Sequence, residues 1–163
     1  MAGTYFGGFK AWAKPSDCAI KMDLPTSLAI GTVRTPEFRV KHKVYRILLR
    51  VESNAPMRDV SCLLGTDWSS IGIKCDKEPL DQEPIIEGTW IIWDGANKVA
   101  EGSVSGGDGN GETPYERELG HFIGEAKKSY TLEVTFTKDG GPLKGMNPHL
   151  VVRQDYDFGC SPM

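Results

Sequence analysis

A strict alternation of apolar and polar residues in the stretch 129–137 constrains the fold of this chain most. The apolar positions are Tyr130, Leu132, Val134 and Phe136, and Ser, Thr and Glu fill the positions between them. Because successive side chains of a β-strand point to opposite faces, this pattern predicts a strand with one face in a core and the other in water. The turn-forming residues 138–142 end it.

Other short stretches can pair with that strand. Residues 37–52 are strand-like, with an apolar parity that switches across residues 41–43, which predicts a bulge or turn there. Residues 85–93 form a second strong strand, and 94–97 carry a hairpin signal. Residues 117–124, with Leu119, His121 and Ile123 on one side, and 149–153 complete the set. The pattern predicts an all-β, single-domain antiparallel β-sandwich of seven to nine short strands, without a helix.

The remaining chain is predicted to be irregular. Residues 1–36 are interrupted by Gly and Pro and leave room for one short edge strand, so we place the sandwich core at 37–163. Val60, Cys62 and Leu64 predict a short strand that ends at Gly65. The long loop that follows, 66–84, is of a kind that is usually functional or held by a covalent bridge.

Composition excludes some function classes. The formal net charge is −3, which provides no overall basic field for nucleic acid or anionic lipid. The longest apolar runs fall short of the roughly 18 residues of a membrane span. We therefore expect a globular binding protein with neither a nucleic-acid partner nor a membrane span.

The four cysteines favour disulfides over metal ligation, because none is paired at C-x-x-C spacing. Three pairings are open in principle. We favour Cys62–Cys75, which would close the long loop, and Cys18–Cys160, which would tie the ends together; four reduced thiols are the alternative. Disulfides indicate an oxidising compartment such as the periplasm. Residues 1–5 do not resemble a signal peptide, so we expect a mature segment that follows a removed leader or lipid anchor, rather than a cytosolic protein.

The motifs that could carry chemistry are weak. Residues 108–112 resemble the start of a calcium loop, but Thr113 and Leu119 stand where an EF-hand needs Gly and Glu. The histidines lack metal-ligand spacing, and His121 is predicted to be a hydrogen-bonded structural residue. Scattered carboxylates single out no hydrolase pair. We expect no catalytic residue, no metal and no cofactor.

Loops and one strand face supply the candidate binding residues. Trp90 is predicted to be core by its parity, whereas Trp68 in the long loop is the best exposed tryptophan. The candidate partner-binding residues are Trp68, Asp108 and Asn110 on loops, with Arg46 and Arg50 on one strand face.

Several segments of the chain resemble a group of small proteobacterial secreted proteins and lipoproteins. These segments are Cys62-Leu63-Leu64-Gly65, Trp90-Ile91-Ile92-Trp93-Asp94, Arg117-Glu118-Leu119-Gly120-His121-Phe122, Tyr130-Thr131-Leu132-Glu133-Val134 and Asn147-Pro148-His149-Leu150-Val151-Val152. The resemblance covers residues 37–153 and implies a periplasmic β-sandwich. Some small lipoproteins of this kind are immunity proteins against secreted antibacterial effectors, and the resemblance implies no catalytic residues.

These observations together give two functional hypotheses. The leading one is a non-enzymatic periplasmic protein-binding domain, an immunity protein that occludes the active site of a toxin with a loop or a sheet edge. The alternative is a carbohydrate-binding module, which would require exposed, coplanar aromatic side chains.

Overall fold

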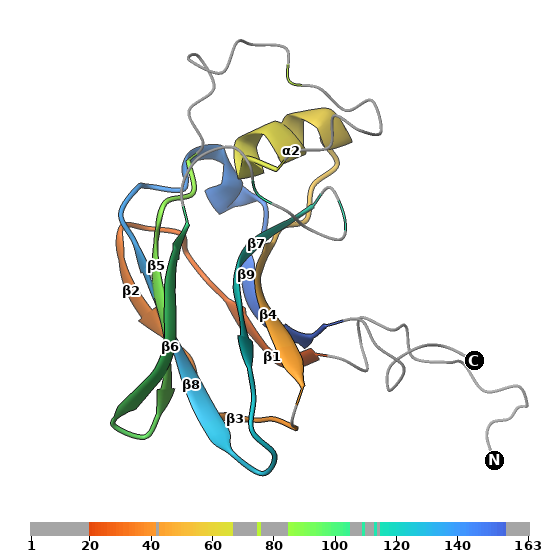
Figure 1. The fold of residues 1–163 in the computed structure, drawn as a ribbon. Coiled ribbons are helices and arrows are strands. Elements are labelled where there is room, and N and C mark those ends of the chain that lie inside the picture. Colours follow the sequence, from red (N-terminus) through yellow and green to blue (C-terminus); the bar gives the residue numbers. More distant parts are fainter. Residues whose placement is uncertain are drawn as a thin grey trace, which may run out of the picture.

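A computed structural model of the chain describes residues 20–41, 43–66, 75, 85–104, 109, 113 and 115–155 (Figure 1). Within these residues nine strands and two helical segments occur. The strands are β1 (Ile20–Pro25), β2 (Gly31–Arg34), β3 (Phe38–Arg39), β4 (Val44–Arg50), β5 (Gly88–Asp94), β6 (Asn97–Val104), β7 (Glu116–Ile123), β8 (Ser129–Phe136) and β9 (His149–Gln154). The helical segments are the α-helix α2 (Met57–Leu64) and the 3-10 helix η3 (Gly141–Gly145). None of the described helices is long and apolar enough to cross a membrane.

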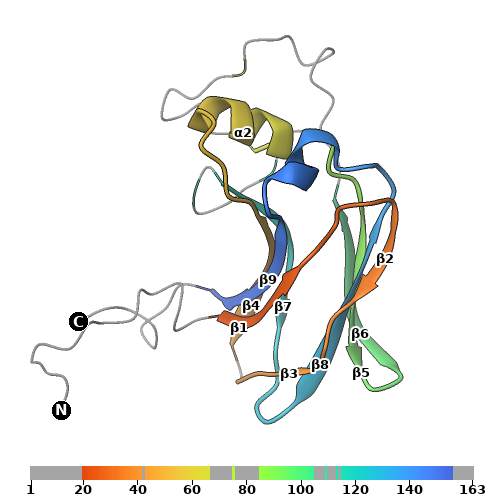
Figure 2. The same ribbon diagram turned by 180° about the vertical axis from the view of Figure 1, so that it is seen from behind.

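The strands form two antiparallel sheets that lie face to face. The first sheet has the order β1-β9-β4-β7, and the second has the order β2-β8-β5-β6, with β3 also paired to β8. Figures 1 and 2 show the two layers from opposite sides. The predicted all-β, antiparallel sandwich is therefore confirmed.

Strand β8 lies in the middle of the second sheet, between β5 on one side and β2 and β3 on the other. Its burial alternates strictly along its length. The predicted inward residues Tyr130, Leu132, Val134 and Phe136 are all buried. This strand contributes four side chains to a core that the first sheet fills mainly from β4, with Tyr45, Ile47 and Leu49 fully buried.

The break predicted near residues 41–43 marks the point where the chain changes sheets. Strand β3 pairs with β8 in the second sheet, and β4 pairs with β7 and β9 in the first. Phe38 and Val40 on one parity and Tyr45 on the other are all buried, so the switch keeps both apolar sets in one core. The hairpin predicted at 94–97 is also confirmed, because Asp94 pairs with Asn97 across a turn.

The strand predicted from Val60, Cys62 and Leu64 is wrong, because these residues lie in the α-helix α2. Val60 and Leu64 are four residues apart, so they share a helix face, and both are fully buried. Gly65 ends the helix in the left-handed conformation at φ 78° and donates its N–H to the carbonyls of Ser61 and Cys62. In a segment this short, the spacing of the apolar residues fits both the two-residue period of a strand and the 3.6-residue period of a helix. Packing against η3 and β7 favours the helix.

The stretch 20–36 contains two strands, where an irregular segment with one edge strand was expected. Strand β1 is an edge of the first sheet, paired to β9, and β2 is an edge of the second, paired to β8. Leu28, between them, is buried in the core. The sandwich therefore already includes this stretch.

Candidate functional site

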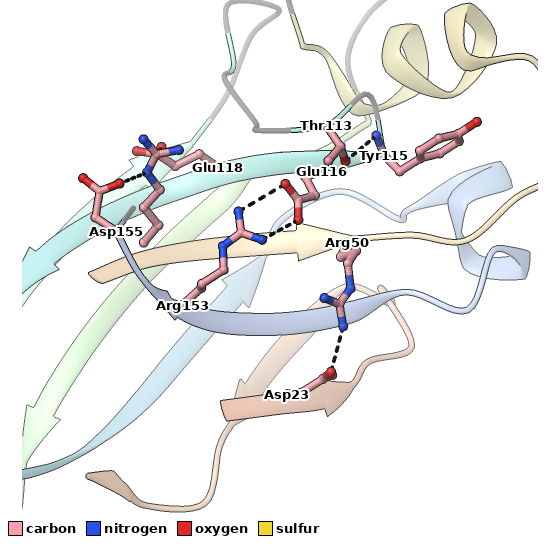
Figure 3. A network of polar contacts seen from close by, with 9 residues as sticks. Asp23, Arg50, Thr113, Tyr115, Glu116, Glu118, Arg153 and Asp155 are labelled. Atoms are coloured by element: carbon pink, nitrogen blue, oxygen red, sulfur yellow. Dashed lines mark hydrogen bonds and ion pairs between the residues drawn. The ribbon is translucent and has the colours of Figure 1, made fainter. Parts of the chain in front are cut away.

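The face of the first sheet that points away from the core carries most of its charged residues. We call it the outer face. On β4 it consists of Val44, Arg46, Leu48 and Arg50; on β9 of His149, Val151 and Arg153; on β7 of Glu116, Glu118, His121 and Ile123; and on β1 of Asp23. Four strands that are far apart in the sequence therefore place their charges side by side (Figure 3).

Arg46 and Arg50, the two arginines singled out from the sequence, both lie on the outer face and are both held by carboxylates. The Nε of Arg46 lies 2.9 Å from Oδ1 of Asp155 and 3.7 Å from Oε1 of Glu118. The Nη2 of Arg50 donates to Oδ2 of Asp23 over 2.8 Å. The two arginine side chains keep 27% and 30% of their surface exposed. They are thus oriented by their partners and still accessible from outside.

A third arginine, Arg153, forms a buried ion pair with Glu116 between these two contacts. Its Nη1 and Nη2 donate to Oε2 and Oε1 of Glu116 over 3.0 and 3.3 Å. The side chains are only 4% and 3% exposed. Arg153 reaches across β4 to meet its partner (Figure 3). Two parallel hydrogen bonds between charged groups fix the guanidinium in orientation as well as in position.

The apolar floor of the outer face explains why this pair is buried. Leu48 and Val151 point the same way as the arginines, are direct cross-strand neighbours, and are fully buried. Arginine covers apolar neighbours with its aliphatic stem while its guanidinium reaches a polar partner. The outer face therefore has a dry base and a charged upper layer. In such a layer, direct neighbours of like charge, such as Arg46 and Arg153, depend on the surrounding carboxylates.

Both described histidines of the outer face contact a carboxylate. Nδ1 of His149 lies 2.5 Å from Oδ1 of Asp23, so this aspartate binds both His149 and Arg50. Nδ1 of His121 lies 3.4 Å from Oε2 of Glu118, so the predicted hydrogen bond of this histidine is present. Its side chain is 69% exposed, so His121 lies on the surface and is not a structural residue of the core.

The prediction that Leu119, His121 and Ile123 share one side of the strand is wrong for Leu119, because β7 is bulged. Ile47 pairs with Gly120 and Leu48 with Glu118, so Leu119 is an extra residue between them. The bulge reverses the alternation. Leu119 therefore packs in the core, while His121 and Ile123 lie on the outer face.

Other sequence-predicted residues have different outcomes. Cys62 and Cys75 are joined by a disulfide, with Cα atoms 5.7 Å apart, as preferred. Trp90 is 5% exposed and belongs to the core, as predicted. Several candidates lie outside the described residues: Trp68, Asp108, Asn110, Cys18 and Cys160.

Sequence reasoning missed most of the outer face. It found Arg46 and Arg50 but not their partner Asp23, nor the pair of Arg153 and Glu116. One signal was present, because Arg153 directly follows the apolar run 150–152, where a charge needs a buried partner.

The outer face of the second sheet is the other candidate surface. The guanidinium of Arg34 lies 5.4 Å from the ring centre of Trp93, and its Nη1 lies 3.4 Å from Oε1 of Glu133. The indole of Trp93 is half-buried, and its Nε1 is a buried donor without a hydrogen-bond partner in the described structure. Among the described residues, the large hydrophobic side chains that are exposed are all aliphatic: Ile30, Val44, Met57, Val99 and Ile123.

Comparisons with known proteins support the fold, and the proposal for function is based on the residues of this chain. No protein-family model matches the sequence, and no curated protein matches it. Among solved structures, the crystal structure of a protein from Sulfurospirillum deleyianum is similar, with a TM-score of 0.60 and 16% sequence identity. The match covers 83% of this chain and 98% of that one. At this identity the chain is similar to that protein in its fold alone.

Proposed function

We propose that this protein is a non-enzymatic protein-binding domain that uses the outer face of the first sheet, and that it acts as an immunity protein against a secreted antibacterial effector. The single observation that carries the proposal is the row of three arginines, Arg46, Arg153 and Arg50, each held by a carboxylate from a neighbouring segment. In this proposal the charged residues of the outer face bind a partner protein and do not catalyse a reaction.

An oriented arginine favours protein recognition for a physical reason. Binding a partner costs side-chain entropy, and a guanidinium already fixed by a carboxylate has less of that entropy to lose. Arginine is also among the residues that contribute most to binding energy at protein interfaces. Arg46 and Arg50 retain exposed surface and are fixed on a rigid sheet, so they meet both conditions.

The disulfide between Cys62 and Cys75 supports an oxidising compartment, which we propose to be the periplasm. A protein located there could meet an incoming effector before it reaches its target. In this proposal the outer face docks on the effector and excludes its substrate. A lipid anchor at the N-terminal side would fit the same location.

A carbohydrate-binding module is the second candidate, and Trp93 is the observation that favours it. A sugar stacks on an exposed aromatic ring, whereas Trp93 is half-buried and has the guanidinium of Arg34 against it. Sugar binding there would require Arg34 to move away. The outer face of the first sheet needs no such rearrangement, and we prefer it.

A capture experiment with matched variants tests the proposal. The tagged protein, the double variant Arg46→Gln/Arg50→Gln and the control Arg34→Gln are each exposed to lysate of the source organism. The control neutralises an arginine on the opposite face of the sandwich. Bound proteins are identified by mass spectrometry, and circular dichroism verifies the fold of each variant.

We expect one stoichiometric partner to bind the wild type and Arg34→Gln, with at least about tenfold weaker binding to the double variant, because two interface charges are lost. The purified partner should be a toxic enzyme that the protein inhibits. Equal capture by all three proteins would refute the role of the outer face. A sugar that binds the wild type but not Trp93→Ala would favour the second candidate.

A further inference from the structure

Two turns meet at the end of the outer face that is formed by Val44 and Ile123. The N–H of Val40, between β3 and β4, donates to the carbonyl of Lys128 over 3.1 Å. The N–H of Gly124, after β7, donates to the carbonyl of Lys43 over 2.9 Å. We call residues 37–41, 43–46 and 121–130 the basic tip; it lies at the lower end of the molecule in Figure 1.

Positive charge is concentrated in the basic tip. In a chain with 19 Lys and Arg and 22 Asp and Glu, its sequence contains six of the former and two of the latter. The six are Arg39, Lys41, Lys43, Arg46, Lys127 and Lys128, and the two are Glu37 and Glu125. The four lysines are exposed. Carboxylates border the tip: Asp155 lies beside Arg46, and Asp94 lies 3.2 Å from Nζ of Lys128 and raises the pKa of that lysine. The basic tip is thus a local positive region on a protein of net charge −3.

An exposed apolar pair lies beside these lysines. Val44 and Ile123 are direct cross-strand partners on β4 and β7 and are 37% and 66% exposed. Lys43, which precedes β4, and Gly124, which follows β7, are joined by the hydrogen bond between their backbones. Exposed aliphatic side chains at the end of two strands, with lysines in the adjoining turns, are suited to a partner that supplies both an apolar group and negative charge.

The backbone of the tip is strained at one of its lysines. Lys127 has φ 66°, in the left-handed region that favours glycine. A side chain there costs about 1 kcal/mol of backbone strain relative to glycine.

We propose that the basic tip binds an acidic segment of a partner protein, with an aliphatic side chain of that segment seated on Val44 and Ile123. This inference rests on the proposed function and names the chemistry of the partner at one end of the outer face. The two sites are continuous, because Arg46 belongs to both. Charge complementarity selects the acidic partner.

A protein segment fits the tip better than an anionic membrane does. Glu37 and Glu125 are exposed within the tip, and Asp94 is 33% exposed at its border. Exposed carboxylates among the lysines repel a continuous layer of lipid phosphates, whereas a peptide with spaced acidic side chains can pair with individual lysines. The lipid surface is therefore an outcome of the test rather than the proposal.

The test uses a fluorescein-labelled peptide with one leucine between runs of glutamate, and a second peptide in which lysine replaces glutamate. Fluorescence anisotropy is measured with the full-length protein at low and at physiological salt. The variants are Lys41→Glu/Lys127→Glu, Ile123→Ser and the control Lys144→Glu. Lys144 lies on η3, a helical segment that packs against α2, and is 42% exposed. Vesicles with and without phosphatidylserine are tested in parallel by sedimentation.

We expect saturable binding of the acidic peptide alone, weakened by salt, reduced about tenfold or more in the lysine double variant and severalfold in Ile123→Ser, and unchanged in the control. Equal binding of both peptides, or no effect of the lysine substitutions, would overturn the proposal. Binding to phosphatidylserine vesicles without binding of the peptide would overturn it in favour of a membrane.

The same variants separate this inference from the proposed function. If the partner captured from lysate binds Lys41→Glu/Lys127→Glu as well as wild type but does not bind Arg46→Gln/Arg50→Gln, the tip inference fails and the proposed function stands. If the acidic peptide binds at the tip but the captured protein is not inhibited, the proposed immunity role fails and the tip remains an acidic-peptide site.

Discussion

The indole Nε1 of Trp90 donates a hydrogen bond of 2.9 Å to the backbone carbonyl of Leu119, which joins β5 of one sheet to β7 of the other. The ring lies between two glycines, Gly102 on β6 and Gly120 on β7, where a Cβ atom would come within 2.6 and 2.4 Å of it. The bulged residue Leu119 and these glycines therefore hold the two sheets together along this side of the sandwich.

Substitutions at this contact should both destabilise the fold, one by adding atoms to the packed interior and the other by removing them. Gly120→Ala places a methyl group where the indole lies, and we expect a loss of about 2 kcal/mol in the free energy of unfolding from overpacking. Trp90→Phe removes the donor and leaves a cavity, with an expected loss of about 3 kcal/mol. Urea unfolding measures both. The control is Gly145→Ala, where a Cβ atom would meet nothing within 4 Å. A Gly120→Ala variant as stable as wild type would contradict this account.

The buried pair of Glu116 and Arg153 should behave as a unit. Glu116→Leu leaves a buried guanidinium without its carboxylate, and we expect the protein to lose about 3–5 kcal/mol of stability. The double variant Glu116→Leu/Arg153→Met removes both charges and should recover most of this loss. Chemical unfolding of the two variants gives the coupling energy. Additive losses would show that the two residues do not interact.

The Cys62–Cys75 disulfide should stabilise the protein, because it closes a loop between residues separated by 13 positions. For a loop of this size we expect Cys62→Ser/Cys75→Ser to lose about 3 kcal/mol of unfolding free energy. The variant and the wild type are compared by thermal unfolding with and without reductant. Reductant should lower the melting temperature of the wild type more than that of the variant, which keeps Cys18 and Cys160. An equal effect on both proteins would speak against the Cys62–Cys75 bond.

The carboxylate of Asp139 should make stability depend on pH in acid. The backbone N–H of Gly141, and then the ammonium of Lys144, hold the pKa of Asp139 below its ordinary value of 3.8. A lowered pKa in the folded state stabilises the fold above 3.8, and this contribution disappears as the pH falls through the lowered pKa. Asp139→Asn should therefore be less stable than wild type near neutral pH and equally stable in strong acid.

Urea unfolding across this pH range measures that difference. Lys144→Met removes the second cause of the lowered pKa of Asp139 and keeps the first. This variant should therefore lose stability relative to wild type in the same pH range as Asp139→Asn, but by a smaller amount. A difference between wild type and Asp139→Asn that does not change with pH would contradict the role of the charge.

Relief of the strain at Lys127 should separate stability from binding. Lys127→Gly fits φ 66° without strain, and we expect a gain of about 0.5 kcal/mol because the more flexible unfolded chain cancels part of the relief. The same variant should bind the acidic peptide less well because it lacks the ammonium. Thermal unfolding and anisotropy are the two measurements. Unchanged peptide binding would show that this lysine does not take part.

Local patterns predicted the strands well. The alternation in 129–137, the turn at 94–97 and the parity switch near 41–43 each depend on neighbouring residues, and the structure has β8, the β5–β6 hairpin and the change of sheets at those places. The pattern failed at α2, at the bulge in β7 and in the stretch 20–36, which has two strands where one was expected. These departures depend on what packs against the segment, which local periodicity does not record.

The candidate site was predicted only in part, because its contacts are long-range. Arg46 and Arg50 share a face by their spacing along one strand. Glu116 and Arg153 are 37 positions apart, and Asp23 and Arg50 are 27 apart. Their meeting depends on which strands become neighbours.

The sequence by itself determined regular strands such as β8 and which of their faces is apolar, because a side chain's direction along an unbroken strand follows from its position. Only the tertiary structure decided the order β1-β9-β4-β7 and, with it, the charged outer face. It also brought the turns at Lys43 and Lys128 together into the basic tip. Strand order is set by the burial of both sheets against one core, a property of the whole chain that no single segment contains.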